Sequence, residues 1–216
     1  MNIKAKPFDE NSDRYEMWFD RNKVIYKSEL LAVGKLLPKR GKGIEVGVGS
    51  GKFSEPFSIP VGVDPSTDML RLAKKRGIQV IKGVGENLPI KNSEFDFVLI
   101  VTTICFFDDI KQALKEAKRI LKPSGAIIIG FIDKDSQIGK KYQSEKDKNV
   151  FYKEAEFFSV NEVVQLLKEA GFSDFSYVQT MFHSLDSISE VEGMKEGYGE
   201  GSFVVIKGRR KIGKHL

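Results

Sequence analysis

Three glycines alternate with other residues in a short stretch, Ile44 to Gly51, that reads IEVGVGSG. The β-branched residues before them predict a strand, and the glycines leave the backbone bare where that strand ends. Gly47 would permit a tight turn, Gly49 would let a ligand touch the backbone, and Gly51 would ease the start of a helix. The stretch therefore predicts a ligand-binding turn, although three glycines would also suit a loose loop.

Two acidic residues accompany this turn. Glu45 lies inside the first predicted strand, and Asp64 ends the second, which reads IPVGVD. A carboxylate at the end of the second strand can accept hydrogen bonds from the vicinal hydroxyls of a ribose. The ligand is therefore expected to contain a nucleoside, which nicotinamide-dependent oxidoreductases and other nucleoside-binding enzymes share.

The spacing of the glycines separates these classes. A dinucleotide fingerprint reads G-x-G-x-x-G and places a pyrophosphate on the N-terminus of a full helix. Here the spacing is G-x-G-x-G, and Pro56 interrupts any helix after about one turn. Glu45 would repel phosphates and would suit an ammonium group. The pattern predicts a nucleoside joined to an amino acid and disfavours a nicotinamide-dependent oxidoreductase.

Alternating strand and helix patterns must position these residues. They predict an α/β fold, a doubly wound and mostly parallel sheet of seven strands with helices on both faces. The last strand should return antiparallel, because residues 181–201 contain no helical pattern. The predicted strands are 43–47, 58–63, 78–82, 94–101, 125–132, 172–180 and 202–208; the predicted helices are 13–37, one capped by Ser66 or Asp64, one capped by Asp109 and one opened by the capping box Ser159–Glu162.

Four segments in a fixed order carry a family resemblance. They are Glu45–Gly51, Val63–Leu70, Gly83–Pro89 followed by Phe95 and Asp96, and Leu114–Gly125. With these segments the chain, from about Tyr15 to Ile206, resembles a class I S-adenosylmethionine-dependent methyltransferase. The similarity is to the broad group of small-molecule and ubiquinone/menaquinone-type methyltransferases.

The resemblance implies roles in binding S-adenosyl-L-methionine. Glu45, Gly47 and Gly49 would face the methionine moiety, and Asp64 would face the ribose. The other cofactor-binding residues that it implies are Ser66 and Met69 at the edge of the adenosine, Gly85 and Glu86 beside the adenine, and Val101 beside the sulfonium. Val84 stands where the family often has an acidic residue, so the adenine amino group would be held by a backbone carbonyl or by Glu86.

Methyl transfer needs alignment and exclusion of water more than it needs an acid–base pair. Related enzymes often carry histidines just after the fourth strand, whereas this chain has Cys105 and Phe106 there. His183, after the sixth predicted strand, is either a base or a surface residue. Asp133 and Asp135 follow the fifth strand, as acceptor-binding groups or as solvated acids. No pattern of metal ligands is present, and no metal is expected.

Aromatic residues gather where a lid is expected. Tyr15 and Trp18 lie in the N-terminal helical region, and more aromatics lie between the fifth strand and the following helix. In relatives both segments close over the ligands, although packing in the core is an equal alternative. We therefore expect residues 1–38 to form a helical lid, 39–208 the methyltransferase domain and 209–216 a basic tail.

Composition limits the class of partner. The formal net charge is +5, yet the last ten residues carry five Lys or Arg and no acid, so the rest of the chain is balanced. No segment is apolar for long enough to cross a membrane, and Cys105 is the single cysteine. The sequence predicts a cytoplasmic methyltransferase for a small-molecule amine or hydroxyl, without nucleic acid or membrane partners. An RNA or protein methyltransferase and a non-catalytic S-adenosylmethionine-binding module remain alternatives, and the oligomeric state stays open.

Overall fold

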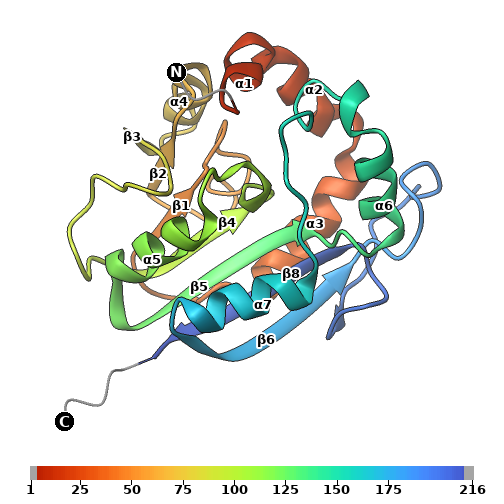
Figure 1. Ribbon diagram of the computed structural model, residues 1–216. Coiled ribbons are helices and arrows are strands. Elements are labelled where there is room, and N and C mark those ends of the chain that lie inside the picture. The colour runs from red at the N-terminus through yellow and green to blue at the C-terminus, as the bar shows by residue number, and fades with distance from the viewer. Residues whose placement is uncertain (1–3, 212–216) are drawn as a thin grey trace.

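A computed structural model describes residues 4–211. Its centre is one eight-stranded sheet in the order β3-β2-β1-β4-β5-β8-β6-β7, flanked by helices (Figure 1). The strands are β1 (Gly43–Val46), β2 (Val61–Asp64), β3 (Gln79–Lys82), β4 (Phe95–Val101), β5 (Leu121–Ile132), β6 (Phe172–Thr180), β7 (Lys195–Glu196) and β8 (Phe203–Arg210).

The sheet is parallel from β3 to β5 and antiparallel where β8 enters. β1 pairs in parallel with both β2 and β4, so their carboxyl ends share one edge of the sheet. β8 lies between β5 and β6 and is antiparallel to both. The predicted doubly wound fold and its antiparallel last strand are confirmed.

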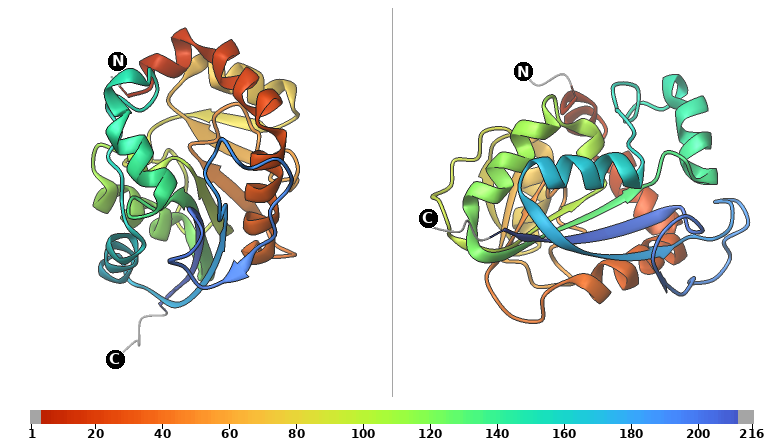
Figure 2. Two further views of the ribbon diagram at one scale, coloured as in Figure 1. Left: turned by 90° about the vertical axis from the view of Figure 1, so that its right-hand side faces the viewer. Right: turned by 60° about the horizontal axis from the view of Figure 1, so that its bottom comes forward.

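The sheet buries both faces, and neighbouring residues of a strand point to opposite sides. Val98 and Ile100 of β4 pack in the core under α5 (Ile110–Ile120) and α7 (Val160–Glu169). Phe97 and Leu99 pack in the core on the opposite face, with α3 (Lys23–Leu36). Figure 2 shows these helices on the two sides of the sheet. Burial on both faces explains why the strands read as continuous apolar runs.

Three predicted details of the sheet are wrong. There are eight strands, because the short β7 forms inside the stretch 181–201 and pairs with β6. β5 begins at Leu121, four residues before the predicted start of this strand at residue 125. Arg209 and Arg210 belong to β8 and pair with β5 and β6, so they are not part of a tail. Residues 212–216 of the predicted tail lie outside the described residues.

The N-terminal region contains three helices where a single one was predicted. They are α1 (Lys6–Glu10), α2 (Ser12–Arg21) and α3. Asn22 separates α2 from α3, with φ −112° and ψ 41°, and its side-chain amide donates to the carbonyl of Trp18. An asparagine that bonds the backbone in this way competes with the helix, and the chain changes direction there.

The predicted helix starts are confirmed. Ser66 caps α4 (Thr67–Lys75), Asp109 caps α5, and Ser159 with Glu162 forms the capping box of α7. Residues 51–58, expected to form no full helix because of Pro56, fold as turns. The sequence patterns did not predict α6 (Gln137–Ser144), which lies between β5 and α7. No helix within residues 4–211 is long and apolar enough to span a membrane.

Candidate functional site

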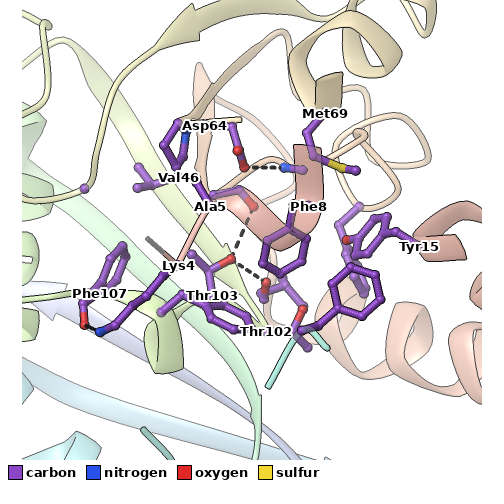
Figure 3. A pocket seen from close by; sticks show the side chains of 18 of the residues that line it. Lys4, Ala5, Phe8, Tyr15, Val46, Asp64, Met69, Thr102, Thr103 and Phe107 are labelled. Atoms are coloured by element: carbon purple, nitrogen blue, oxygen red, sulfur yellow. Dashed lines mark hydrogen bonds between the residues drawn. The ribbon is translucent and has the colours of Figure 1, made fainter. Parts of the chain in front are cut away.

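A cavity lies beyond the carboxyl ends of β1, β2 and β4, between the sheet and the N-terminal helices. The glycine turn, the end of β2 and the loop 83–86 line one part of it, and residues from α2, α3 and α6 line the other. Figure 3 shows Asp64 and Met69 at the top of the view, Thr102 and Thr103 below them, Phe8 in the middle and Tyr15 at the right. This is the edge of a doubly wound sheet at which ligands bind.

Asp64 is held rigidly at the end of β2. Its Oδ2 accepts a hydrogen bond from the Gly49 amide at 2.8 Å, and its Oδ1 accepts one from the Ser66 amide at 2.9 Å. Burial raises the pKa of Asp64 to about 6, although the two hydrogen bonds act in the opposite direction and lower this pKa. Each oxygen keeps a further lone pair, so the carboxylate can accept two hydroxyl donors from a ligand.

The glycine turn is tight. Gly47 and Gly49 have φ of +76° and +51°, in the left-handed region that favours glycine. A Cβ on Gly47 would lie 2.1 Å from Cγ2 of Thr103, so no side chain fits there. A Cβ on Gly49 would lie 3.1 Å from the Tyr15 hydroxyl, inside the cavity. The turn thus offers bare backbone to a ligand between Asp64 and Tyr15.

Replacing Gly49 with valine should therefore weaken binding of a ligand in this turn by at least about tenfold, because the side chain enters the cavity and the left-handed backbone costs roughly 1–2 kcal/mol. Titration calorimetry with S-adenosylmethionine measures this. Gly77→Val is the matched control, because Gly77 has φ +81° and a Cβ there would meet nothing within 4 Å. Equal affinities in the two variants would contradict the role of Gly49.

Three residues that were predicted to bind the cofactor stand behind the cavity lining. Glu45 is buried in β1, where its Oε2 accepts a hydrogen bond from the Ser54 hydroxyl at 2.5 Å, and burial raises its pKa to about 8. Ser66 serves as the cap of α4 and donates to Asp9. Gly51 is buried against α4. Direct contact of these residues with the cofactor stays a prediction.

The remaining predicted cofactor residues line the cavity together. The loop that carries Gly85 and Glu86 is fastened by the Glu86 carboxylate, which accepts hydrogen bonds from the amides of Asp108 and Asp109 at 2.7 and 3.3 Å. Met69 and Val101 complete the wall between α4 and the end of β4. The residues that the structure brings to the lining are Gly47, Gly49, Asp64, Met69, Gly85, Glu86, Val101, Tyr15 and Trp18.

The N-terminal helices cover the cavity. Phe8 of α1 packs edge-on against Tyr15 of α2, with ring centroids 5.8 Å apart, and its ring lies tilted against that of Phe151, at 5.1 Å. Asp9 fixes α1 to the start of α4 by accepting hydrogen bonds from the Ser66 hydroxyl at 2.6 Å and the Asp68 amide at 3.2 Å. The first helices and the segment that follows α6 thus meet above the site. A lid function for residues 1–38 stays a prediction.

The other residues with catalytic potential lie elsewhere. The His183 side chain is 72% exposed and pairs with Glu192 at 2.5 Å, and it does not line the cavity. Asp133 is buried in the turn after β5 and accepts a hydrogen bond from the Asp135 amide, and neither residue reaches the lining. Phe106 lines the cavity, whereas Cys105 lines a smaller apolar recess beside it.

The sequence patterns missed one acidic residue in the lining, Glu29 of α3. It is 4% exposed, and burial raises its pKa to about 8. Its signal was present in the sequence: Ile25, Glu29 and Val33 follow one another at helical spacing, which places a carboxylate on an apolar stripe. Lys4, also missed, lines the cavity and donates to the Phe107 carbonyl at 2.8 Å (Figure 3).

Known proteins share both the sequence and this architecture. A methyltransferase domain family matches residues 44–129. A solved structure from Thermotoga maritima, described as an S-adenosylmethionine-dependent methyltransferase and possible histamine N-methyltransferase, has 50% identity and a TM-score of 0.94, over 96% of this chain and 100% of that chain. An uncharacterised protein of Methanocaldococcus jannaschii is 50% identical over 203 residues, 94% of this chain and 98% of its own length. This chain belongs to the class I S-adenosylmethionine-dependent methyltransferases.

The relation to the menaquinone enzymes is more distant. A demethylmenaquinone methyltransferase of Chlorobaculum tepidum is 30% identical over 169 residues, covering 66% of this methyltransferase and 70% of that protein. The predicted family is thus confirmed, while the identity of the methyl acceptor does not follow from it.

The residues present fit S-adenosylmethionine, which the methyltransferase uses as its methyl donor. The Asp64 oxygens retain acceptor capacity toward the cavity. At Gly49 a side chain would fill the space beside Tyr15. When bound, the cofactor supplies a methyl group on a positively charged sulfur. The aromatic lining of Tyr15, Trp18 and Phe106 suits such a cation and excludes water from it.

Proposed function

We propose that the methyltransferase transfers a methyl group to a small molecule through an amine or hydroxyl group of that molecule. The observation that carries the proposal is the covered cavity, with Phe8, Tyr15 and Phe151 packed together above it. An acceptor that must lie under this cover is a molecule of limited size. The proposed location of the reaction is the cytoplasm.

The charge of the lining supports a small acceptor over a nucleic acid. Within residues 4–211, Lys4 is the one cation that lines the cavity, and its ammonium pairs with Asp108 at 3.1 Å. A nucleic-acid backbone would need several Lys or Arg along a groove. The description of the Thermotoga maritima relative as a possible histamine N-methyltransferase also supports an amine of small size.

An acceptor screen with labelled methyl donor tests the proposal. We expect transfer to small amines or hydroxylated metabolites, unchanged in a chain truncated after Lys211 and unchanged between low and moderate salt. The truncation point keeps Arg209 and Arg210, because both belong to β8. Transfer to total RNA that falls about a thousandfold between 50 and 200 mM salt would show contacts to about six phosphates and would overturn the proposal.

A further inference from the structure

Glu29 is a buried carboxyl group that has no hydrogen-bond or ion-pair partner in the part of the chain that the structure describes. It is nevertheless one of the residues that line the cavity. Burial disfavours the charged form of a carboxyl group, so a cationic ligand in the cavity would stabilise an ionised Glu29.

Glu29 and Asp64 belong to opposite parts of the site. Asp64 ends β2, near one edge of the sheet, whereas α3 packs against β5, β8 and β6, on the other side of β4. The glycine turn, Met69 and Gly85 belong with Asp64 in the cofactor half. Glu29 therefore lies in the other half of the cavity, away from the half that holds Asp64.

Tyrosine hydroxyl groups accompany Glu29 there. Burial raises the pKa of Tyr142 and of Tyr152, and the negative charge of Glu29 adds to both shifts, so the three groups lie within electrostatic reach of one another. Neither hydroxyl hydrogen-bonds to another residue within 4–211, and both side chains line the cavity. The two rings stack with centroids 5.2 Å apart. A carboxylate accompanied by two hydroxyl groups that have no partner within 4–211 is a recognition site for an ammonium ion.

Building on the proposed function, we propose that Glu29 binds the methyl acceptor and that this acceptor is a basic amine, held as its ammonium ion by the Glu29 carboxylate with the hydroxyl groups of Tyr142 and Tyr152 as further partners. Glu86 and Asp64 make the rest of the lining acidic as well, while Lys4 is tied to Phe107 and Asp108. The cavity thus favours a cation over a neutral or anionic acceptor.

Glu29 would also accept the proton that the ammonium group of the acceptor must lose before methyl transfer. An ammonium ion has no lone pair, so it must first give one proton to the Glu29 carboxylate, which becomes a neutral carboxylic acid. The freed nitrogen lone pair then forms the new N–C bond while the C–S bond breaks and its electron pair stays on sulfur. Burial already favours the protonated carboxyl group at this position, which lowers the cost of that transfer.

The proposal is tested with Glu29→Gln, which keeps the size of the side chain and removes its charge. Glu190→Gln is the matched control, because Glu190 is exposed and does not line the cavity. Titration calorimetry in the presence of S-adenosylhomocysteine would use histamine, 2-phenylethylamine and the neutral analogue 2-phenylethanol as probes. Labelled methyl transfer to the same three compounds gives kcat and KM, and thermal unfolding reports folding.

We expect the wild-type protein to bind at least one of the amines and to prefer 2-phenylethylamine to 2-phenylethanol. Glu29→Gln should weaken amine binding by about tenfold to 100-fold, leave alcohol binding within about twofold and leave S-adenosylmethionine binding within about threefold. Glu190→Gln should match the wild type. Unfolding at or above the wild-type temperature would show that Glu29→Gln folds.

Three results would overturn the assignment of Glu29. They are equal amine binding in Glu29→Gln and the wild type, a loss of S-adenosylmethionine affinity as large as the loss for amines, and transfer to alcohols but not to amines. In the last case the proposed function stands and the amine site fails. If neither probe class binds and RNA is methylated instead, the proposed function fails together with the amine site.

Discussion

Replacing Asp64 with alanine is expected to weaken S-adenosylmethionine binding by about 2–4 kcal/mol, the loss of one or two charge-assisted hydrogen bonds to the ribose. The Asp64 carboxylate is fixed by the amides of Gly49 and Ser66 and does not have to be ordered when the ligand arrives. Titration calorimetry of the purified variant measures the effect. Since burial raises the pKa of Asp64 to about 6, binding by the wild-type protein should also weaken as the pH falls below about 6.

Two variants separate this role from a loss of structure. Asp64→Asn keeps one side-chain acceptor oxygen and should lose less affinity than Asp64→Ala. Asp135→Ala removes an aspartate that follows β5 and does not line the cavity, so its affinity should equal that of the wild type. An Asp64→Ala protein that binds S-adenosylmethionine normally would remove Asp64 from the site.

The second large effect concerns stability. In the absence of ligand, Glu29→Gln is expected to raise the free energy of unfolding at pH 7 by about 3 kcal/mol. Burial raises the pKa of Glu29 from 4.5 to about 8, so the folded state holds a proton that the unfolded state has released. The wild-type protein therefore loses stability as the pH rises from about 4.5 to about 8, and below about pH 4 the two proteins should be equally stable.

Urea denaturation at pH 4, 6 and 8 measures this difference, with Glu190→Gln as a control that should follow the wild type at each pH. If Glu29→Gln is more stable than the wild type and binds amines less tightly, the Glu29 carboxylate serves ligand binding at a cost in stability. A Glu29→Gln variant that is less stable than the wild type at pH 8 would instead show that the carboxylate holds the fold together.

The parts of the site that depend on local backbone chemistry could be predicted from the sequence. The glycine turn follows from residues that accept left-handed φ, and Asp64 follows from its place at the end of a strand. The caps Ser66 and Asp109 satisfy amides within three residues of themselves. Such short-range features depend only on neighbouring residues, which is why they could be predicted from the sequence.

The features that were missed depend on residues far apart in the chain. Helical spacing shows that Glu29 faces inward, but the packing of α3 on β6 and β8 decides that it meets a cavity there. Arg210 was assigned to a tail because its partner in the sheet, Phe172, lies 38 residues earlier in the sequence. A pairing between strands so far apart cannot be seen in the residues around Arg210. The helix break at Asn22 depends on one side-chain bond to the backbone, which hydrophobic periodicity does not register.

The place of β8 in the sheet affects the order in which the molecule can be completed. The strand lies between β5 and β6, yet it is synthesised after both. While the ribosome adds the preceding residues, β5 and β6 each present an unpaired edge to the cell, and an unpaired edge can join strands of other chains. We therefore expect folding to end with the insertion of β8 between β5 and β6, which pairs the exposed edges of both strands in one step.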